Sequence, residues 1–533
     1  MTAISLALIF VVVLYTLWTR ARGRSETKAL PPGPKKLLII GNLLEIPSTR
    51  PWVMFAKWAR DYGSGVIHIS APGTSIIVLS SLEAMRDLLE KRGSRYSDRG
   101  PMPMMKDLIG WDFSFDDEWR RQRKLLHRDF SLASVQKLRP QLRDAARELI
   151  RDLSNDPQAE VMSLMGLFTA RTIIRTLYGL EVPHLNHAYI KNAVDAIQAA
   201  SAAAVPGAFL VVSHFPIESK LENNNSVIEG YLPDPAVRSW VVPRRGISEE
   251  SKALEEVDRS FAGSSFPGSR TPGVRQQNNT AQPCFVQRQL ADCKTAEQIQ
   301  SLKAAAASMY ATGADTTISP LGTFVLAMME HPDIQRHAQD QIDRVVGRGR
   351  LPDFEDRARL PYVDAILKEL FRWRPSGPIG IPHYISVDDE YRGYHIPAGS
   401  KVIANVWGLL QNEDLFPDPH DFRPERFLVN GVLREDIVVD PAAIIFGFGR
   451  RSSETRTDLG RPADCQSLPH RLCPGQAFAL DSLWITIATL LAAMHIEKPR
   501  DESGNIVEPS HEYFYGVNSV AVQVKHHAQV FTE

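Results

Sequence analysis

The stretch "IIFGFGRRSSETRTDLGRPADCQSLPHRLCPGQAFA", residues 444–479, contains what look like two halves of one loop. The first half, "FGFGRR" at 446–451, is a glycine-rich turn that could pass close to a flat cofactor. The second half begins at Cys473, just before the apolar run "AFALDSLWITIATLLAAMHI". A thiol at the N-terminus of a helix faces the positive end of the helix dipole, which favours the thiolate that binds metals. The polar residues between the halves resemble neither of them.

Size and composition describe an ordinary folded protein with a large core. The chain has 533 residues, 44% of them hydrophobic and 23% charged. Its formal net charge of −1 gives no basic field for nucleic acid. So few cysteines predict no disulfide framework, and their spacing matches no zinc motif, so we expect a catalytic domain in a reducing compartment. They are Cys284, Cys293, Cys465 and Cys473.

The N-terminal residues predict a membrane anchor. Residues 2–19 carry no charge, and as a helix they would be about 27 Å long, close to the hydrocarbon thickness of a bilayer. The basic residues that follow place the body of the protein on the cytosolic side. A cleaved signal peptide would need positive charge before the run and small residues after it, and neither is present. We expect an anchor at 1–24 and a stiff proline-rich hinge at 25–40, which contains "LPPGP".

Hydrophobic periodicity predicts a mainly helical fold with a small β-rich region near the N-terminus. No internal repeat is evident, and the polar residues at 218–283 are expected to form surface loops. Strands are predicted at 65–70 and 75–80, and helices at 51–63, 117–130, 135–153, 164–180 and 295–332.

The segment "KELFRWRP", 368–375, places Glu369 and Arg372 on one face of a predicted helix, where they can form an ion pair. Taken alone, such a pair is more often a solvated surface contact. Arg426, in the proline-dense segment "FPDPHDFRPERFL" at 416–428, could complete a network of one glutamate and two arginines.

A second unusual segment is "ATGADTT", 311–317, inside the longest predicted helix. Gly313 costs about 1 kcal/mol relative to alanine in a helix, which indicates that something approaches the backbone closely. Asp315 and Thr316 then place an acid beside an alcohol in an apolar helix, although a glycine kink with a locally bonded threonine is the simpler alternative. Pro320 removes the donor to the Thr316 carbonyl and is expected to kink the helix.

These features, in this order, resemble the cytochrome P450 family of haem-thiolate monooxygenases nearly from end to end. The sequence of the motifs is similar to that of microsomal fungal enzymes of secondary metabolism. The resemblance implies that Cys473 is the thiolate ligand of the haem iron, which favours O–O cleavage. Asp315 and Thr316 would handle dioxygen and deliver protons. Glu369, Arg372 and Arg426 would brace the haem side of the fold.

The resemblance also implies a set of haem contacts and an electron donor. Haem-contacting positions are expected at Trp119, Arg123, Gly313, His383, Phe446, Arg451, Arg471 and Gly475, with Trp119, Arg123 and His383 pairing the propionates. The basic face at 120–124 would suit an acidic partner, by resemblance NADPH-cytochrome P450 reductase. No dinucleotide-binding fingerprint is present, so the electrons of NADPH should arrive through that partner.

The implied architecture is the mainly α-helical cytochrome P450 fold, with one N-terminal transmembrane helix and a single haem-binding domain at 41–533. The implied location is the endoplasmic reticulum membrane, with a single pass and a cytosolic catalytic domain. The implied activity inserts one oxygen atom of O2 into a hydrophobic small molecule, with secondary-metabolite biosynthesis as the expected setting.

One departure from the family is large. The family's cysteine falls seven residues after the phenylalanine of the loop, where this chain has Ser453, and Cys473 comes twenty residues later. Deleting 452–471 would restore an ordinary loop, "FGFGRRLCPGQAFA". The hypothesis is therefore a retained intron or a gene-model error, and the alternative is a real loop with an entropic cost of about 1–2 kcal/mol. Cys465 is a rival ligand, but no glycine or helix follows it.

Two further functional hypotheses remain at this point. A chain carrying this insertion could be a catalytically impaired product that binds haem poorly. A haem-thiolate isomerase or peroxygenase is the other possibility, and the pair Asp315 and Thr316 argues against it because that pair serves dioxygen activation.

Overall fold

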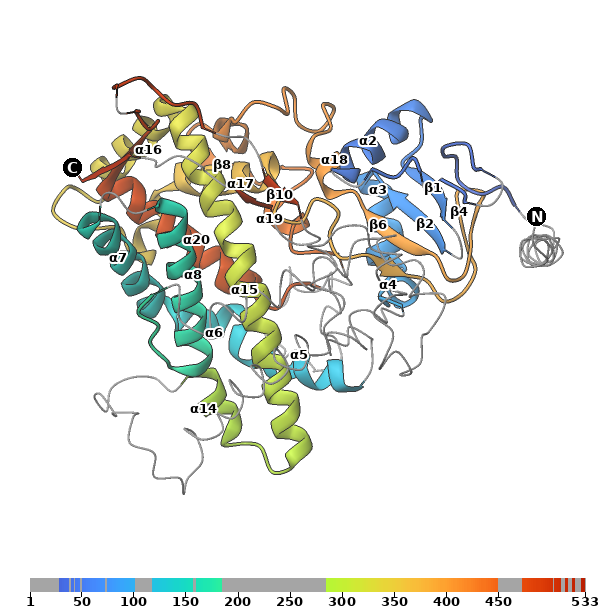
Figure 1. Cartoon of the computed structure of the whole chain (residues 1–533), viewed down its shortest axis with the longest axis horizontal. Helices are drawn as coiled ribbons and strands as arrows, with labels where there is room; N and C mark the ends of the chain where they lie inside the picture. The colour runs from blue at the N-terminus through green and yellow to red at the C-terminus, as the bar shows by residue number, and fades with distance from the viewer. Residues whose placement is uncertain are drawn as a thin grey trace, which may run out of the picture.

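The computed structural model describes residues 28–37, 40–42, 44–47, 50–71, 74–100, 117–156, 160–184, 284–448, 472–501, 503–509, 513–515, 520–522 and 529–532. The predicted anchor at 1–24 and the predicted insertion at 452–471 lie outside these residues. Helices form most of the described part, and a small β-rich region lies at the end where the described chain begins (Figure 1). The predicted fold class of a mainly helical protein with a small β-rich region is confirmed.

The helices are α2 (Pro51–Asp61), α3 (Leu82–Met85), the π-helix η1 (Arg86–Lys91), α4 (Gly93–Tyr96), α5 (Asp117–Phe130), α6 (Leu132–Gln136), α7 (Arg139–Asn155), α8 (Val161–Tyr178), α14 (Phe285–Leu290), α15 (Ala296–Glu330), α16 (Pro332–Val345), the 3-10 helix η4 (Phe354–Arg359), α17 (Pro361–Trp373), α18 (Val406–Leu410), the 3-10 helix η5 (Pro424–Phe427), α19 (Pro441–Ile444) and α20 (Gln476–Ala493). The strands are β1 (Val66–Ala71), β2 (Thr74–Leu79), β3 (His383–Tyr384), β4 (Asp389–Tyr391), β5 (Tyr394–Ile396), β6 (Lys401–Ala404), β7 (Leu428–Val429), β8 (Val432–Leu433), β9 (Met494–Glu497), β10 (Tyr513–Tyr515), β11 (Val520–Val522) and β12 (Gln529–Thr532).

A sheet in the order β1-β2-β6-β3 forms the centre of the β-rich region. β1 and β2 are antiparallel, with Ile67 opposite Val78, and β6 joins β2 in parallel. Because side chains alternate across a strand, Ile67 packs with Trp52 and Trp58 of α2 on one face, while the other face joins a second cluster. The two strands predicted from alternation are thus confirmed within one residue.

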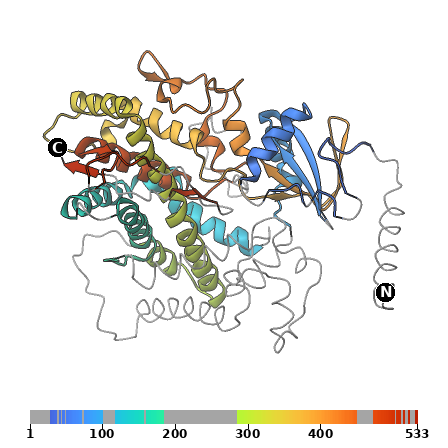
Figure 2. The same ribbon diagram turned by 45° about the horizontal axis from the view of Figure 1, so that its top comes forward.

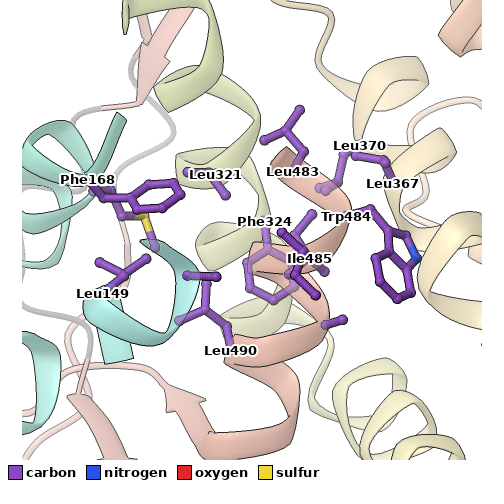
Figure 3. Packing of buried hydrophobic residues seen from close by; sticks show 14 of the residues in the cluster. Leu149, Phe168, Leu321, Phe324, Leu367, Leu370, Leu483, Trp484, Ile485 and Leu490 are labelled. Atoms are coloured by element: carbon purple, nitrogen blue, oxygen red, sulfur yellow. The ribbon is translucent and has the colours of Figure 1, made fainter. Parts of the chain in front are cut away.

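The main core lies where α7, α8, α15, α17 and α20 meet. Figure 3 shows side chains from these helices pointing toward one another, and all of them are almost fully buried. Burying such a side chain contributes about 1.5–3 kcal/mol, so packing holds the helices together. Representative members are Leu149, Phe168, Phe324, Leu370 and Leu490.

Two long helices determine how the core is built. Among the described residues, α20 is long and apolar enough to cross a membrane, but most of it is buried inside the protein, so it is a core helix. α15 starts at a capping box on Thr295, where the side chain accepts the Gln298 amide at 3.2 Å. It continues without interruption through Pro320 to Glu330, so the expected loss of one backbone donor does not end the helix.

The residues before β1 are tied to the sheet rather than to a helix. Residues 28–37 contain no helix, as the prolines predict. The Asn42 side chain donates to the carbonyls of Pro34 and Lys35, both at 3.1 Å, and accepts the Ser70 amide at 3.0 Å. Gly41 has φ of +60°, and a β-carbon there would collide with the Ser70 carbonyl. This segment therefore enters the fold along a defined path.

His68 on β1 predicts an acid-sensitive stability. The side chain is 3% exposed, its Nε2 lies 3.0 Å from Ser75 Oγ, and within the described part its Nδ1 has no partner. Burial, with a contribution from Lys36, lowers the pKa of His68 to about 4. His68 therefore takes up a proton below about pH 6.5 in the unfolded chain, whereas in the folded chain it stays neutral until the pH approaches 4. The free energy of unfolding should consequently drop by about 2 kcal/mol between pH 7.5 and pH 5.

Denaturant unfolding at the two pH values checks this expectation. On acidification the free energy of unfolding of the variant His68→Gln should fall by about 2 kcal/mol less than that of the wild type. His420→Gln, which changes an exposed histidine, should keep the wild-type pH dependence. Equal pH dependence in all three proteins would contradict the assignment.

Candidate active site

The two halves of the cysteine loop meet in the folded chain. The amide of Cys473 donates to the carbonyl of Phe446 at 2.9 Å, which closes the loop across the residues between them. Gly447 follows with φ of +96°, a conformation that glycine adopts without strain. The predicted insertion therefore does not separate the phenylalanine turn from the cysteine.

Cys473 lies just before α20, where Gly475 is the N-cap residue. The Gly475 amide donates to the Cys473 sulfur, and a β-carbon on Gly475 would lie 3.7 Å from that sulfur and 3.0 Å from the Met309 methyl carbon. Any larger residue at 475 would crowd the side of the thiol. Glycine therefore keeps the amide donor against the sulfur.

The surroundings of the Cys473 thiol shift its pKa in opposite directions. Burial raises its pKa, and the Gly475 amide and the Arg123 guanidinium act in the opposite direction. The Cys473 side chain is nevertheless exposed, so the sulfur remains accessible to a ligand. Such a thiol becomes a thiolate when a cation binds it.

The donor set at Cys473 fits a haem. In the part of the chain that the structure describes, no group of three or more His, Cys, Asp or Glu side chains could hold a metal ion. A porphyrin supplies four of the ligands of its iron, so a single cysteine thiolate is enough to attach a haem to the protein. The amide and guanidinium beside the sulfur are the groups expected around a thiolate ligand.

Arg123 joins the predicted propionate-binding helix to the cysteine loop. It lies on α5, and its guanidinium donates to the carbonyl of Leu472, the residue before Cys473. Burial lowers the pKa of Arg123, and the nearby Cys473 opposes that effect. Trp119 lies half-buried one turn earlier on the same helix. The helix that carries both residues, α5, is in contact with α15, as Figure 2 shows.

The other predicted haem contacts are distributed differently. His383 is buried in β3, where its Nδ1 lies 2.7 Å from the carbonyl of Tyr96, so it belongs to the sheet. Its predicted contact with a propionate stays a prediction. Arg451 and Arg471 lie outside the described residues.

The predicted network of one glutamate and two arginines forms in the core. Arg372 Nε lies 2.7 Å from Glu369 Oε2, and Arg426 Nε lies 3.1 Å from Glu369 Oε1. Glu369 and Arg372 are both fully buried, which rules out the alternative of a solvated surface pair. Arg372 also donates to the carbonyls of Leu410, Pro419 and Asp421 at 2.8–3.2 Å. The network therefore ties the loop before η5 to α17.

On α15, the close approach predicted at Gly313 comes from another helix. A β-carbon at Gly313 would lie 3.4 Å from Ile173 of α8, so the glycine permits tight helix packing. Thr316 is exposed, and its hydroxyl donates to the Thr312 carbonyl at 2.7 Å. Asp315 lies in the same turn of α15, and its side chain is outside the described part.

The basic face of α5 is partly neutralised. Arg121 pairs with Glu118 at 2.7 Å and with Glu297 of α15 at 3.1 Å. Arg120 and Lys124 lie on the same helix. The electrostatic surface predicted for a redox partner is therefore weaker than the count of arginines and lysines indicates.

Sequence reasoning missed a buried aspartate that fixes α20. Asp481, 4% exposed, lies two turns after Cys473. Its carboxylate accepts hydrogen bonds from Arg139 of α7 at 2.7 Å and from Arg357 of η4 at 2.9 Å. These contacts hold the helix that begins after the cysteine against two neighbouring elements. The available signal was a single acid in an apolar helix, which predicts a buried partner without identifying it.

Comparisons with known proteins agree on one family. The sequence model of the family described as Cytochrome P450 matches residues 31–232 and 252–452. A cytochrome P450 monooxygenase of Armillaria gallica is 37% identical over 522 residues, covering 96% of this chain and 93% of the relative. Cytochrome P450 monooxygenase 98 of Postia placenta is 35% identical over 520 residues, covering 95% and 90%. Tryptamine 4-monooxygenase of Psilocybe cyanescens is 32% identical over 497 residues, covering 91% and 90%.

The fold has a counterpart among solved structures. A zebrafish cytochrome P450 solved with abiraterone superimposes with a TM-score of 0.66 and covers 91% of this chain and 100% of its own. At 19% identity this likeness concerns the fold alone. The match to the family model ends at residue 452, where the predicted insertion begins, whereas the alignments with the fungal relatives extend beyond it.

A mainly helical fold with a cysteine just before a buried helix is the arrangement expected of a haem-thiolate protein, and the family match assigns the chain to that class. The chain belongs to the cytochrome P450 family and is a monooxygenase, an oxidoreductase. Members of this family carry a thiolate-ligated haem, bind hydrophobic substrates and need a redox partner.

Proposed function

We propose that this monooxygenase is anchored in the endoplasmic reticulum membrane and oxidises a hydrophobic small molecule in secondary-metabolite biosynthesis. The observation that carries the proposal is the closed loop at Cys473, where the Phe446 carbonyl, the Gly475 amide and the Arg123 guanidinium converge. Tryptamine 4-monooxygenase, named among the relatives, supports a substrate with an aromatic ring.

The bound haem would supply the activation of dioxygen. In the proposed roles, Cys473 holds the iron, and Gly475 keeps its amide against the sulfur. Arg123, Trp119 and His383 would bind the propionates. Thr316 would present its hydroxyl toward the oxygen that leaves as water, and Asp315 would replace the proton that Thr316 gives up.

Electrons and location complete the proposal. No dinucleotide-binding fingerprint occurs in the sequence, so NADPH would deliver electrons through NADPH-cytochrome P450 reductase. The uncharged residues 2–19 and the basic residues after them support a single membrane pass with a cytosolic catalytic domain.

Isotope labelling tests the proposed function. The haem-loaded protein and a fungal reductase would be incubated with NADPH, 18O2 and a panel of apolar and aromatic compounds, with tryptamine among the aromatic ones. One labelled oxygen atom in a product, with the other in water, is the expected result. Products without label, or turnover that needs no oxygen, would contradict it.

Thr316→Ala is expected to separate NADPH consumption from product formation. A positioned proton donor contributes about 10²–10⁴-fold to a reaction step, so product formed per NADPH should fall at least about tenfold while peroxide rises. Thr317→Ala is the matched control, since the Thr317 hydroxyl is buried and donates to the Gly313 carbonyl at 2.9 Å. Equal product yields in Thr316→Ala and the wild type would rule out the proposed role.

A further inference from the structure

A line of hydroxyl side chains runs along one face of α15. The residues recur at intervals of four, four, three and four, which keeps them on the same side of a helix. Hydroxyls are unusual in so apolar a helix, and the two at the far end are fully buried. The line is Ser308, Thr312, Thr316, Ser319 and Thr323.

Three of these hydroxyls donate to the carbonyl one turn earlier. Thr312 donates to Ser308 at 2.8 Å, Thr316 to Thr312 at 2.7 Å and Thr323 to Ser319 at 3.0 Å. Ser319 breaks the pattern, because its Oγ is buried and has no hydrogen-bond partner in the part of the chain that the structure describes. A buried hydroxyl without a partner costs about 1–3 kcal/mol, so it calls for an explanation.

The next residue supplies a second polar group in the same turn. Residue 320 of an α-helix would donate its amide to the carbonyl of residue 316, and Pro320 has no amide hydrogen to donate. A proline ring at position 320 also crowds the carbonyl of residue 316, although α15 continues through Pro320. In an α-helix the carbonyl of residue 316 points along the axis toward residue 320, so it lies in the same turn as the Ser319 side chain.

We propose that one buried water molecule binds between Ser319 Oγ and the Thr316 carbonyl, and that Ser319 thereby acts as a positioning residue for Thr316. A buried water typically satisfies two to four polar groups that protein atoms leave unpaired. The water restores the contact that Pro320 removes and fixes the turn that carries the Thr316 hydroxyl. The functional half rests on the role proposed for Thr316, whereas the water site itself does not.

The sign of a stability change tests the water site. If Ser319 is unpaired, Ser319→Ala removes an unsatisfied group and raises the urea midpoint of unfolding. If a water is bound, the same variant strands that water and lowers the midpoint, with an expected increase of about tenfold in the unfolding equilibrium constant. Thr323→Val, which deletes a hydroxyl that already has an acceptor, is the control and should lower the midpoint in either case.

A double-mutant cycle identifies the second partner of the water. Pro320→Ala returns an amide donor to the Thr316 carbonyl, so the water loses its acceptor and Ser319→Ala should no longer lower the midpoint. The two substitutions should therefore be coupled by about tenfold. Additive effects, or a midpoint raised by Ser319→Ala alone, would overturn the water site.

Product yield then tests the positioning role. Ser319→Ala should reduce product formed per NADPH severalfold, and Ser319→Thr, which keeps a hydroxyl, should restore most of it. A coupled stability cycle with an unchanged yield would overturn the positioning role. If the wild-type chain shows no haem-thiolate spectrum, the proposed function fails, and the stability cycle still decides whether the water is bound.

Discussion

Cys473→Ser is expected to abolish the red-shifted band that a thiolate-ligated haem shows when reduced and exposed to carbon monoxide. A serine hydroxyl is far less acidic than a thiol and does not replace a thiolate as a metal ligand. Even partners of a metal ligand contribute about 10–100-fold to metal affinity or activity, so turnover should fall at least about 100-fold. The measurement is the difference spectrum of the purified variant beside the wild type.

Two controls separate Cys473 from the residues around it. Cys465→Ser should retain the band, because the sequence after Cys465 lacks the glycine that follows Cys473 at position 475. A chain lacking 452–471 should also retain it, because the Cys473 amide already reaches the Phe446 carbonyl across that segment. A band in the shortened chain alone would support the retained-intron hypothesis. A band that survives Cys473→Ser would exclude Cys473 as the ligand.

Arg372→Ala is expected to lower the free energy of unfolding by about 3–5 kcal/mol, which approaches the whole stability of many domains. The substitution leaves the fully buried Glu369 with Arg426 as its one arginine partner, and it removes the Arg372 donor from the carbonyls of Leu410 and Pro419. Circular dichroism during urea unfolding measures the effect, and the yield of soluble protein should fall in parallel.

The control for this prediction is an exposed ion pair of similar length. Arg434 Nη2 lies 2.9 Å from Asp436 Oδ2 on the surface. Arg434→Ala should therefore leave the unfolding midpoint near the wild-type value. Comparable losses in the two variants would mean that burial does not determine the importance of the Glu369 network.

Much of the architecture could be predicted because local periodicity carries it. The predicted helix at 295–332 corresponds to α15, and the predicted strands correspond to β1 and β2. Alternation in a strand and a repeat near 3.6 in a helix are properties of neighbouring residues, so they are visible without tertiary structure. Short elements such as β3 and α19 have no such signal.

The candidate site could be predicted in its residue types and less well in its contacts. The pair Glu369 and Arg372 was visible from its spacing on one helix. The approach of Ile173 to Gly313, and the two arginines on Asp481, join residues that are more than a hundred positions apart. Contacts of that kind depend on how helices pack, and one sequence does not contain that information.

By itself, the sequence determined the helical class and the order of the family motifs, and it predicted Cys473 as the haem ligand, because each depends on residues close together in the chain. Tertiary structure decided whether the interrupted cysteine loop closes, which partners Asp481 finds, and that the Ser319 hydroxyl is buried with no partner among the residues that the structure describes. The physical reason is that burial and long-range hydrogen bonds are set by the packing of whole helices, which no local pattern specifies.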